Sequence, residues 1–474
     1  TLFRSWLMRL SFLAFGSNLF AARIWTVFAG ALLAVYTAKI ARRYRGSGYL
    51  AGFLVVGAAG VAIDARRAMF DLPVAALCTI AIHHGLVWHA HGRLRAAIWA
   101  AVALAAAVMT KGPVALWFYA AALLAALGTR RAAAAGPWWH WLLGAGTFLL
   151  LALPWPVWVQ FAHPEFWQVM RTQAAHREFG LPPLHRAPQL LAALLGLMVP
   201  WSVAVAAGAI AAARTPSQPR APHRWLLLWV ALGLAPFVFM KAFERYLLAL
   251  VCPMAILAAH WLDGCSVRWQ RWHAATATAL LALPVALFSL FALWFGTAYA
   301  APLLALAGLW MTWRIARRPR PDVARTAAMA AILVNVLLGA IYPSLGINRL
   351  PDDLPADLPD TPAETFARAQ PGMLSIAIGR SVQQMDGRAE GLGERLAAFH
   401  GYLFALDEDR ERIEGAAREA GITIEPIGSF HSFYSRKAWL KFFRRGIGKD
   451  AWLDALRSRS LEPLQPRFVY YRLP

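Results

Sequence analysis

Charged residues that could act on a substrate gather in four short segments of an otherwise apolar chain. The first, residues 64–73, holds two carboxylates and two guanidinium groups within eight positions. One interpretation is a solvated turn in which Asp71 caps the helix that follows. The other is chemical: Asp64 or Asp71 can hold a substrate hydroxyl or accept its proton. The guanidinium groups of Arg66 and Arg67 can bind phosphate.

The next two polar segments lie in turns between apolar stretches. Lys111 is the only charged residue of MTKGPVAL, and its ammonium group either reaches the membrane surface or points at an anionic headgroup. The loop at 163–188 carries three histidines and three arginines. Arg186 is a candidate to bind a lipid phosphate, whereas the histidines lack the spacing of a metal site. A single metal ligand, His185, would need partners from elsewhere in the chain.

The fourth segment, residues 240–253, places several polar groups at the end of an apolar stretch. Lys241 and Arg245 are four residues apart, so on a helix they share a face. They repel each other unless an anion, such as a phosphate or Glu244, lies between them. The segment, which continues with Tyr246, therefore either anchors the chain at a membrane surface or binds an anionic group.

The stretches between these segments are apolar enough to cross a membrane. The chain has 474 residues, of which 59% are hydrophobic and 15% charged, and its mean hydropathy is +0.47. A spanning helix needs about 20 apolar residues, so we expect a polytopic α-helical membrane domain, residues 1–343. Its first part, residues 1–20, is expected to be an interfacial amphipathic helix. About twelve spans follow, at roughly 22–40, 48–63, 72–90, 95–108, 113–128, 139–159, 188–212, 225–240, 246–262, 273–294, 299–314 and 323–343.

The charges in the loops predict the orientation of these spans. Every second loop is rich in arginine and lysine, as is typical of cytoplasmic loops. The four polar segments lie in the other loops, which we expect to face the periplasm across a bacterial inner membrane. This pattern accounts for the formal net charge of +22, and no basic, aromatic soluble module indicates nucleic-acid binding.

The end of the chain, residues 363–474, has the composition of a soluble domain and follows a linker at 344–362. We expect a small periplasmic α/β domain, in which His400 and His431 are structural or surface residues. The predicted strands are 373–379, 402–406, 422–428 and 467–473. The predicted helices are 407–420, 436–445 and 449–459.

In their order along the chain, the polar segments resemble the superfamily of aminoarabinose transferases and protein O-mannosyltransferases. The resemblance covers roughly residues 1–260 and implies a GT-C glycosyltransferase fold. It also implies an inverting enzyme with a polyprenyl-phosphate-linked sugar donor and a lipid or protein acceptor on the periplasmic side. The matching motifs are Ala65-Arg66 with Asp71, Thr110 to Pro113, His185 to Pro188 before Pro200-Trp201, and Lys241 to Leu250.

The resemblance also implies roles for single residues. Asp71 falls on an acidic position that matters for activity, and Lys241, Arg245 and Tyr246 fall on the edge of the substrate cavity. His185 lies near a position that helps to hold a divalent metal in some members, so such a metal is the one cofactor expected. The family has an earlier span and a loop that carries the catalytic base. We therefore expect this sequence to be a fragment without that carboxylate, inactive by itself.

Two other functions involve the same class of lipid-linked glycan. One is a flippase or exporter, and the other is a polymerase or ligase of surface polysaccharide. Transporters more often have polar or broken helices near the middle of the membrane, whereas the predicted spans are apolar through their middles. Neither a Walker motif nor a GxGxxG motif is present, which argues against a soluble nucleotide-sugar donor.

Overall fold

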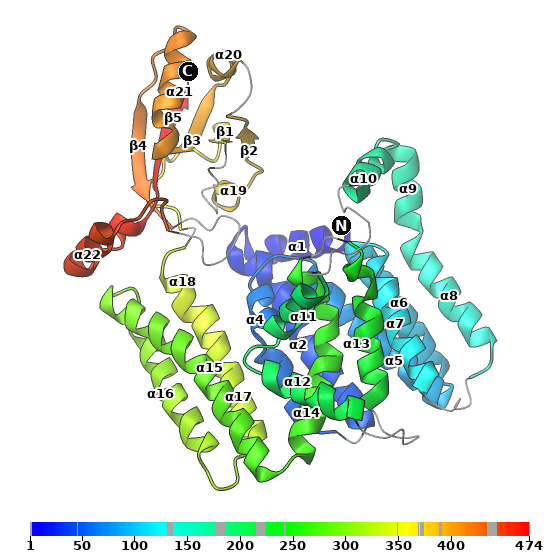
Figure 1. Cartoon of the computed structure of the whole chain (residues 1–474). Coiled ribbons are helices and arrows are strands. Elements are labelled where there is room, and N and C mark those ends of the chain that lie inside the picture. Colours follow the sequence, from blue (N-terminus) through cyan, green and yellow to red (C-terminus); the bar gives the residue numbers. More distant parts are fainter. Residues whose placement is uncertain are drawn as a thin grey trace. The chain divides into compact units, whose positions relative to one another are not determined.

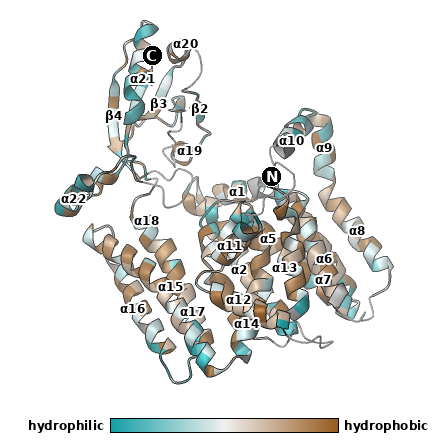
Figure 2. Cartoon of the chain, viewed as in Figure 1, coloured by the Kyte–Doolittle hydropathy of each residue, from teal (hydrophilic) through white to brown (hydrophobic). Residues whose placement is uncertain are grey.

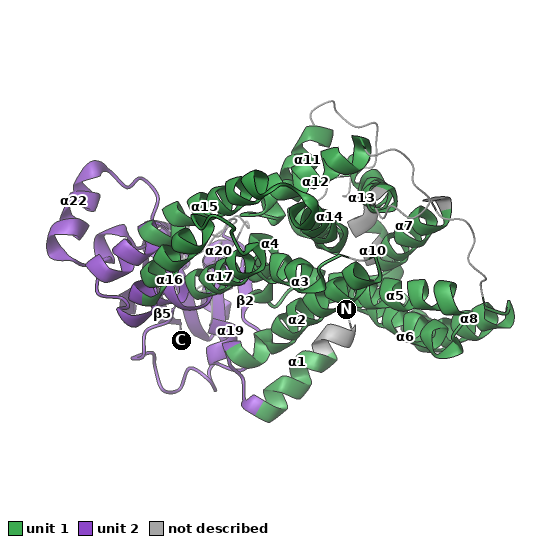
Figure 3. Ribbon diagram, turned by 90° about the horizontal axis from the view of Figure 1, so that it is seen from below, with its two compact units in different colours: residues 1–14, 20–286, 304–338 green, residues 15–19, 287–303, 339–474 purple. Residues whose placement is uncertain are grey.

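The computed structural model describes residues 2–473, apart from 45, 130–135, 176–185, 215–222, 241–242, 348, 368, 370–373, 388–390 and 434–442. The chain divides into two compact units, shown in Figure 3. Unit 1 comprises residues 1–14, 20–286 and 304–338, and unit 2 comprises residues 15–19, 287–303 and 339–474.

The described residues of unit 1 form helices and connecting turns (Figure 1). In chain order the helices are α1 (Leu2–Phe15), α2 (Leu19–Arg43), α3 (Gly48–Val56), α4 (Ala59–Ala65), α5 (Asp71–His91), α6 (Leu94–Lys111), α7 (Val114–Thr129), α8 (Trp139–Ala152), α9 (Pro154–Ala162), α10 (Phe166–Ala175), α11 (Arg186–Leu197), α12 (Ser202–Arg214), α13 (His223–Val238), the 3-10 helix η1 (Glu244–Leu250), α14 (Val251–Gly264), α15 (Val267–Trp294), α16 (Ala300–Ala316) and α17 (Val323–Val336). The ends of α15 and α16 that face each other belong to unit 2.

The helices match the predicted membrane spans. Among the described residues, seven helices are long and apolar enough to cross a membrane, and two bent helix pairs raise the number to nine. The three remaining predicted spans coincide with shorter apolar helices at Val114–Leu127, Arg224–Val238 and Ala300–Ala316. Figure 2 shows hydrophobic residues along most of the length of these helices. The prediction of a multi-pass α-helical membrane protein is therefore confirmed.

Two of the predicted spans are bent, one of them sharply. The stretch 188–212 is not a single straight helix, because α11 and α12 meet at an angle of 119°. Pro200 lies at this bend; it has no amide hydrogen and cannot continue a helix. The carbonyl of Val199 instead accepts a hydrogen bond of 2.8 Å from the amide of Ala59, at the start of α4. A second pair, α3 and α4, is bent by 58°.

The first helix, α1, is joined to the beginning of α2 by two hydrogen bonds. The hydroxyl of Ser11 donates to the carbonyl of Ala21 at 2.6 Å, and the indole of Trp25 donates to the carbonyl of Leu7, also at 2.6 Å. Figure 1 shows α1 running across the direction of α2. Such a course suits the predicted interfacial helix, which would lie along the membrane surface.

The tail in unit 2 is built on a five-stranded sheet with the order β2-β1-β3-β5-β4. β1 is parallel to β2 and β3, and β5 is antiparallel to β3 and β4. Its elements are α18 (Tyr342–Ser344), β1 (Ala363–Phe366), α19 (Leu374–Ala377), β2 (Gln383–Met385), α20 (Leu392–Ala398), β3 (Gly401–Leu406), a 3-10 turn η3 (Asp407–Asp409), α21 (Arg410–Glu419), β4 (Pro426–His431), α22 (Lys449–Ser458), a 3-10 turn η4 (Glu462–Leu464) and β5 (Arg467–Leu473).

The strands β3 and β5 and the helices α21 and α22 confirm four predicted elements of the tail. The predicted strand at 373–379 is wrong: its described part forms the helix α19. Leu374 and Ile378, four residues apart, are both buried in one apolar cluster, which a helical turn allows. The predicted strand 422–428 lies later in the chain, as β4. The predicted helix 436–445 lies mainly outside the described residues.

Helices α12 and α14 approach closely at a glycine. A Cβ atom added at Gly208 would lie 2.6 Å from the carbonyl oxygen of Leu257. We therefore expect Gly208→Ala to force the two helices apart and to cost about 1–3 kcal/mol of unfolding free energy. Gly146, in α8, is the matched control, because a Cβ there meets no atom within 4 Å. Gly146→Ala should leave stability unchanged or raise it by up to about 1 kcal/mol. Equal effects of the two variants in a denaturation assay of the purified protein would contradict this packing.

Candidate active site

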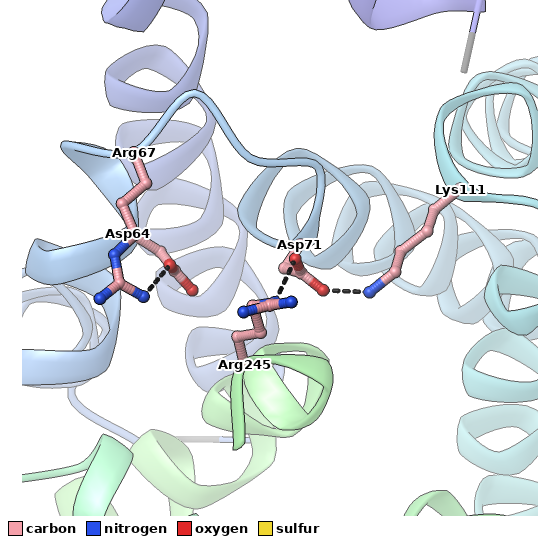
Figure 4. Close-up of polar contacts among 5 residues, drawn as sticks. All are labelled: Asp64, Arg67, Asp71, Lys111 and Arg245. Carbon is pink, nitrogen blue, oxygen red and sulfur yellow. Dashed lines mark hydrogen bonds and ion pairs between the residues drawn. The ribbon is translucent and has the colours of Figure 1, made fainter. Parts of the chain in front are cut away.

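The centre of the candidate site is a carboxylate, Asp71, that contacts two cations. Asp71 is the first residue of α5, and Lys111 is the last residue of α6. The ammonium group of Lys111 bonds to Oδ1 of Asp71, and Nε of Arg245 lies 3.4 Å from Oδ2 (Figure 4). The Asp71 side chain is only 3% exposed, whereas those of Lys111 and Arg245 are 20% and 24% exposed. The carboxylate is therefore buried beneath its two cations.

Local sequence explains why these three residues meet. Consecutive helices α5 and α6 run in opposite directions, so the start of one lies beside the end of the other. Gly112 has a φ of +88°, a conformation that side chains disfavour, and it ends α6 immediately after Lys111. Arg245 comes from η1, a short helix packed beside α5. Three segments far apart in sequence thus each contribute one charge to the site.

Two aromatic rings support the cations. Nζ of Lys111 lies 3.7 Å from the centre of the Tyr246 ring, and the guanidinium carbon of Arg245 lies 4.5 Å from that of Phe243. The negative face of an aromatic ring attracts a cation at such distances. Tyr246 therefore belongs to this cluster, next to Lys111. Phe243 was missed by the sequence analysis, although an aromatic residue beside a paired arginine was a usable signal.

A second buried carboxylate lies close to the first. The Asp64 side chain is 3% exposed, and NH1 of Arg67 lies 3.6 Å from its Oδ1. Among the described residues, this oxygen accepts no hydrogen bond. Figure 4 shows the guanidinium group of Arg245 between Asp64 and Asp71. Buried polar atoms nearly always have hydrogen-bond partners, so Asp64 has an acceptor position available for a substrate group.

The remaining predicted residues differ in what the structure shows. Arg186 begins α11, and its NH1 donates to the carbonyl of Val238 at 3.4 Å. Arg66 directly follows α4 as its C-cap residue. Lys241 and the predicted metal ligand His185 lie outside the described residues. Within the described part of the chain, no group of three or more His, Cys, Asp or Glu residues could hold a metal ion.

The shared carboxylate predicts strong coupling between its partners. Asp71→Asn should lower the free energy of unfolding by about 3 kcal/mol, because two half-buried cations lose their counter-charge. Lys111→Met should also destabilise the protein, but the double variant should cost about 1–3 kcal/mol less than the sum of the two single changes. Denaturation of the four proteins in one detergent measures this difference. Simple additivity would show that the Asp71–Lys111 contact contributes nothing.

Comparison with known proteins adds a family model and two crystal structures. Residues 1–158, which include Asp71 and Lys111, match the model of dolichyl-phosphate-mannose-protein mannosyltransferases. The apo structure of ArnT from Cupriavidus metallidurans is 17% identical, with a TM-score of 0.67, over 90% of this chain and 85% of that one. No sequence among curated proteins matches significantly.

The second crystal structure is that of the same ArnT bound to undecaprenyl phosphate. It is also 17% identical, with a TM-score of 0.68, over 99% of this chain and 87% of that chain. At this level of identity the likeness establishes the fold. The chain therefore has the fold of these two ArnT structures, a helical membrane fold of the GT-C type, as the order of its motifs predicts.

Proposed function

We propose that this protein transfers a sugar from a polyprenyl-phosphate-linked donor to a lipid or protein acceptor at the periplasmic face. A lipid A-like molecule is one such acceptor. The observation that supports this most is the cluster of Lys111 and Arg245 on Asp71, which keeps two cations at one end of a membrane bundle. The match to a mannosyltransferase family model and the fold of a protein crystallised with undecaprenyl phosphate agree with it.

The cations suit the leaving group of this reaction. When the bond between the anomeric carbon and the phosphate oxygen breaks, negative charge grows on the departing polyprenyl phosphate. Lys111 and Arg245 are already held in place by Asp71, so they need little rearrangement to stabilise that charge. Fixed charges of this kind usually provide the largest part of catalysis. Asp71 itself has a cation on each oxygen and holds both cations in place.

The acceptor side of the reaction needs a different group. The acceptor hydroxyl forms a bond to the anomeric carbon, with inversion, and its proton passes to a carboxylate. Among the described residues of this site, Asp64 is suited to accept a hydrogen bond from that hydroxyl, because its Oδ1 pairs with Arg67 at 3.6 Å but accepts no hydrogen bond.

A second candidate function is a flippase or exporter of a lipid-linked glycan. The bent pairs α3–α4 and α11–α12 are the observation that favours it, because transporters often have broken helices at their binding sites. A polymerase or ligase of surface polysaccharide would use the same donor and differ only in the acceptor. Bond cleavage separates the flippase from the two enzymes. A flippase moves its lipid without breaking the sugar–phosphate bond, whereas a transferase and a polymerase or ligase both break it.

The test uses the full-length protein reconstituted in liposomes. It measures the release of radiolabelled sugar from polyprenyl phosphate. Lys111→Met should lower kcat by about 10²- to 10³-fold, because it removes one stabilising charge. Lys39→Met is a matched control, because Lys39 also lies over a tyrosine ring, 4.3 Å from the centre of Tyr36. It is near the C-terminal end of α2 and is not part of the proposed site. This control should keep full turnover.

Two outcomes would contradict the proposed function. Unchanged turnover in Lys111→Met would remove the cation from the mechanism. Movement of intact labelled lipid across the membrane, without release of the sugar, would favour the flippase. Mass spectrometry of lipid A and of periplasmic proteins from a deletion strain would then identify the acceptor of an active transferase.

A further inference from the structure

The tail in unit 2 contains a pocket of about 910 Å³ that the proposed reaction does not use. It lies between the edge of the sheet at β4 and β5, the helix α22 and the turn η4. Four carboxylates line it together with a group of cationic side chains. The basic residues that matter for the inference are His431, Arg444, Arg445 and Arg457.

Three of the arginines in this pocket have no direct carboxylate partner. Among the described residues, the guanidinium groups of Arg444, Arg445 and Arg457 form no ion pair within 4.0 Å. Burial raises the pKa of the Asp409 carboxyl group. The positive charge of the nearby Arg445 lowers this pKa, but by less. Guanidinium groups bind phosphate through paired hydrogen bonds. A pocket with several such groups is suited to a phosphate-bearing ligand.

The pocket lies beside the C-terminal end of the predicted span α15. This end of α15 and the tail both belong to unit 2. The indole nitrogen of Trp294, the last residue of α15, donates to the carbonyl of Leu456 in α22 at 3.3 Å. The guanidinium carbon of Arg459 lies 4.8 Å from the centre of the Trp294 ring. A small apolar cluster around Ala455 also includes Phe295, directly after α15. Helix α22 is thus attached to the terminus of α15.

Helix α22 has two exposed leucines on one of its faces. Ala451 and Ala455 face inward and are buried, whereas Leu453 and Leu456 are 46% and 43% exposed. Tryptophan is enriched at the ends of membrane spans, at the level of the lipid headgroups. With Trp294 at that level, the exposed leucines can contact lipid. Arg457 is four residues after Leu453, on the same side of the helix.

We propose that Arg444, Arg445 and Arg457 bind the phosphate of an anionic lipid headgroup at the membrane surface where α15 ends. Helix α22 then lies in the interface with Leu453 and Leu456 toward the acyl chains, and the pocket is open to the headgroups. This proposal does not depend on the transferase activity. It gives the tail a role as a lipid-binding domain of the membrane protein to which it is joined.

The experiment uses the full chain in nanodiscs of phosphatidylcholine that contain a minor fraction of radiolabelled phosphatidylglycerol. A photoreactive residue, p-benzoylphenylalanine, replaces Ser458, which lines the pocket. We expect crosslinking to the labelled lipid, and a loss of at least about tenfold when the three arginines are changed to alanine, because several charge-assisted bonds disappear. Changing the three arginines to lysine should restore part of the signal, since the charge returns without the paired geometry.

The matched control changes three other arginines of the tail, Arg380, Arg412 and Arg418, to alanine. These residues do not line the pocket, and the variant has the same net charge, so crosslinking should be unchanged. An equal loss in both triple variants would show a general charge effect and overturn the proposal. Equal crosslinking of labelled phosphatidylcholine, or full displacement by inorganic phosphate, would overturn it too, because the site would then not select an anionic lipid.

Discussion

The polar end of the membrane bundle depends on one buried negative charge. Removing a carboxylate from water is costly unless cations compensate for it, and Asp71 is compensated twice, by Lys111 and by Arg245. These contacts fix the start of α5, the end of α6 and the start of η1 relative to one another. The same contacts keep two cations at the surface of the site, where an anionic substrate could reach them. In the proposed function, structural stability and substrate binding therefore rest on the same three side chains.

The sequence predicted the membrane part well because its signals are long and physical. The apolar runs of the sequence coincide with the apolar helices of the described residues, and the alternating loop charge predicts that Asp71, Lys111 and Arg245 lie on one face. Hydropathy gives the height of a residue along a span but not its direction around the helix axis. For this reason the sequence could not show that Asp71 pairs with both cations while Asp64 keeps an oxygen without a hydrogen bond. The sharp bend between α11 and α12 was also missed, because the apolar run continues through Pro200.

The tail was harder to predict for a different reason. Strand β3 is a continuous apolar run and β5 contains one, from Phe468 to Tyr471, and both strands were found. β1 and β2 have only four and three residues, too few for a periodic pattern to stand out. The stretch around Leu374 looks like a strand by composition, but its two core contacts are four residues apart and require a helical turn. Edges and short elements of this sheet are set by neighbours distant in sequence, which a single sequence does not reveal.

The wide spacing of the three charged partners also has a consequence for how the protein is made. Asp71 leaves the ribosome first, Lys111 follows after one helical hairpin, and Arg245 is synthesised only after α13. During membrane insertion the carboxylate can pair with lysine early, but the second cation reaches it only when η1 has been delivered. The site is thus completed late in biogenesis, and the whole chain from α7 to α13 must be synthesised before its charges balance in their final arrangement.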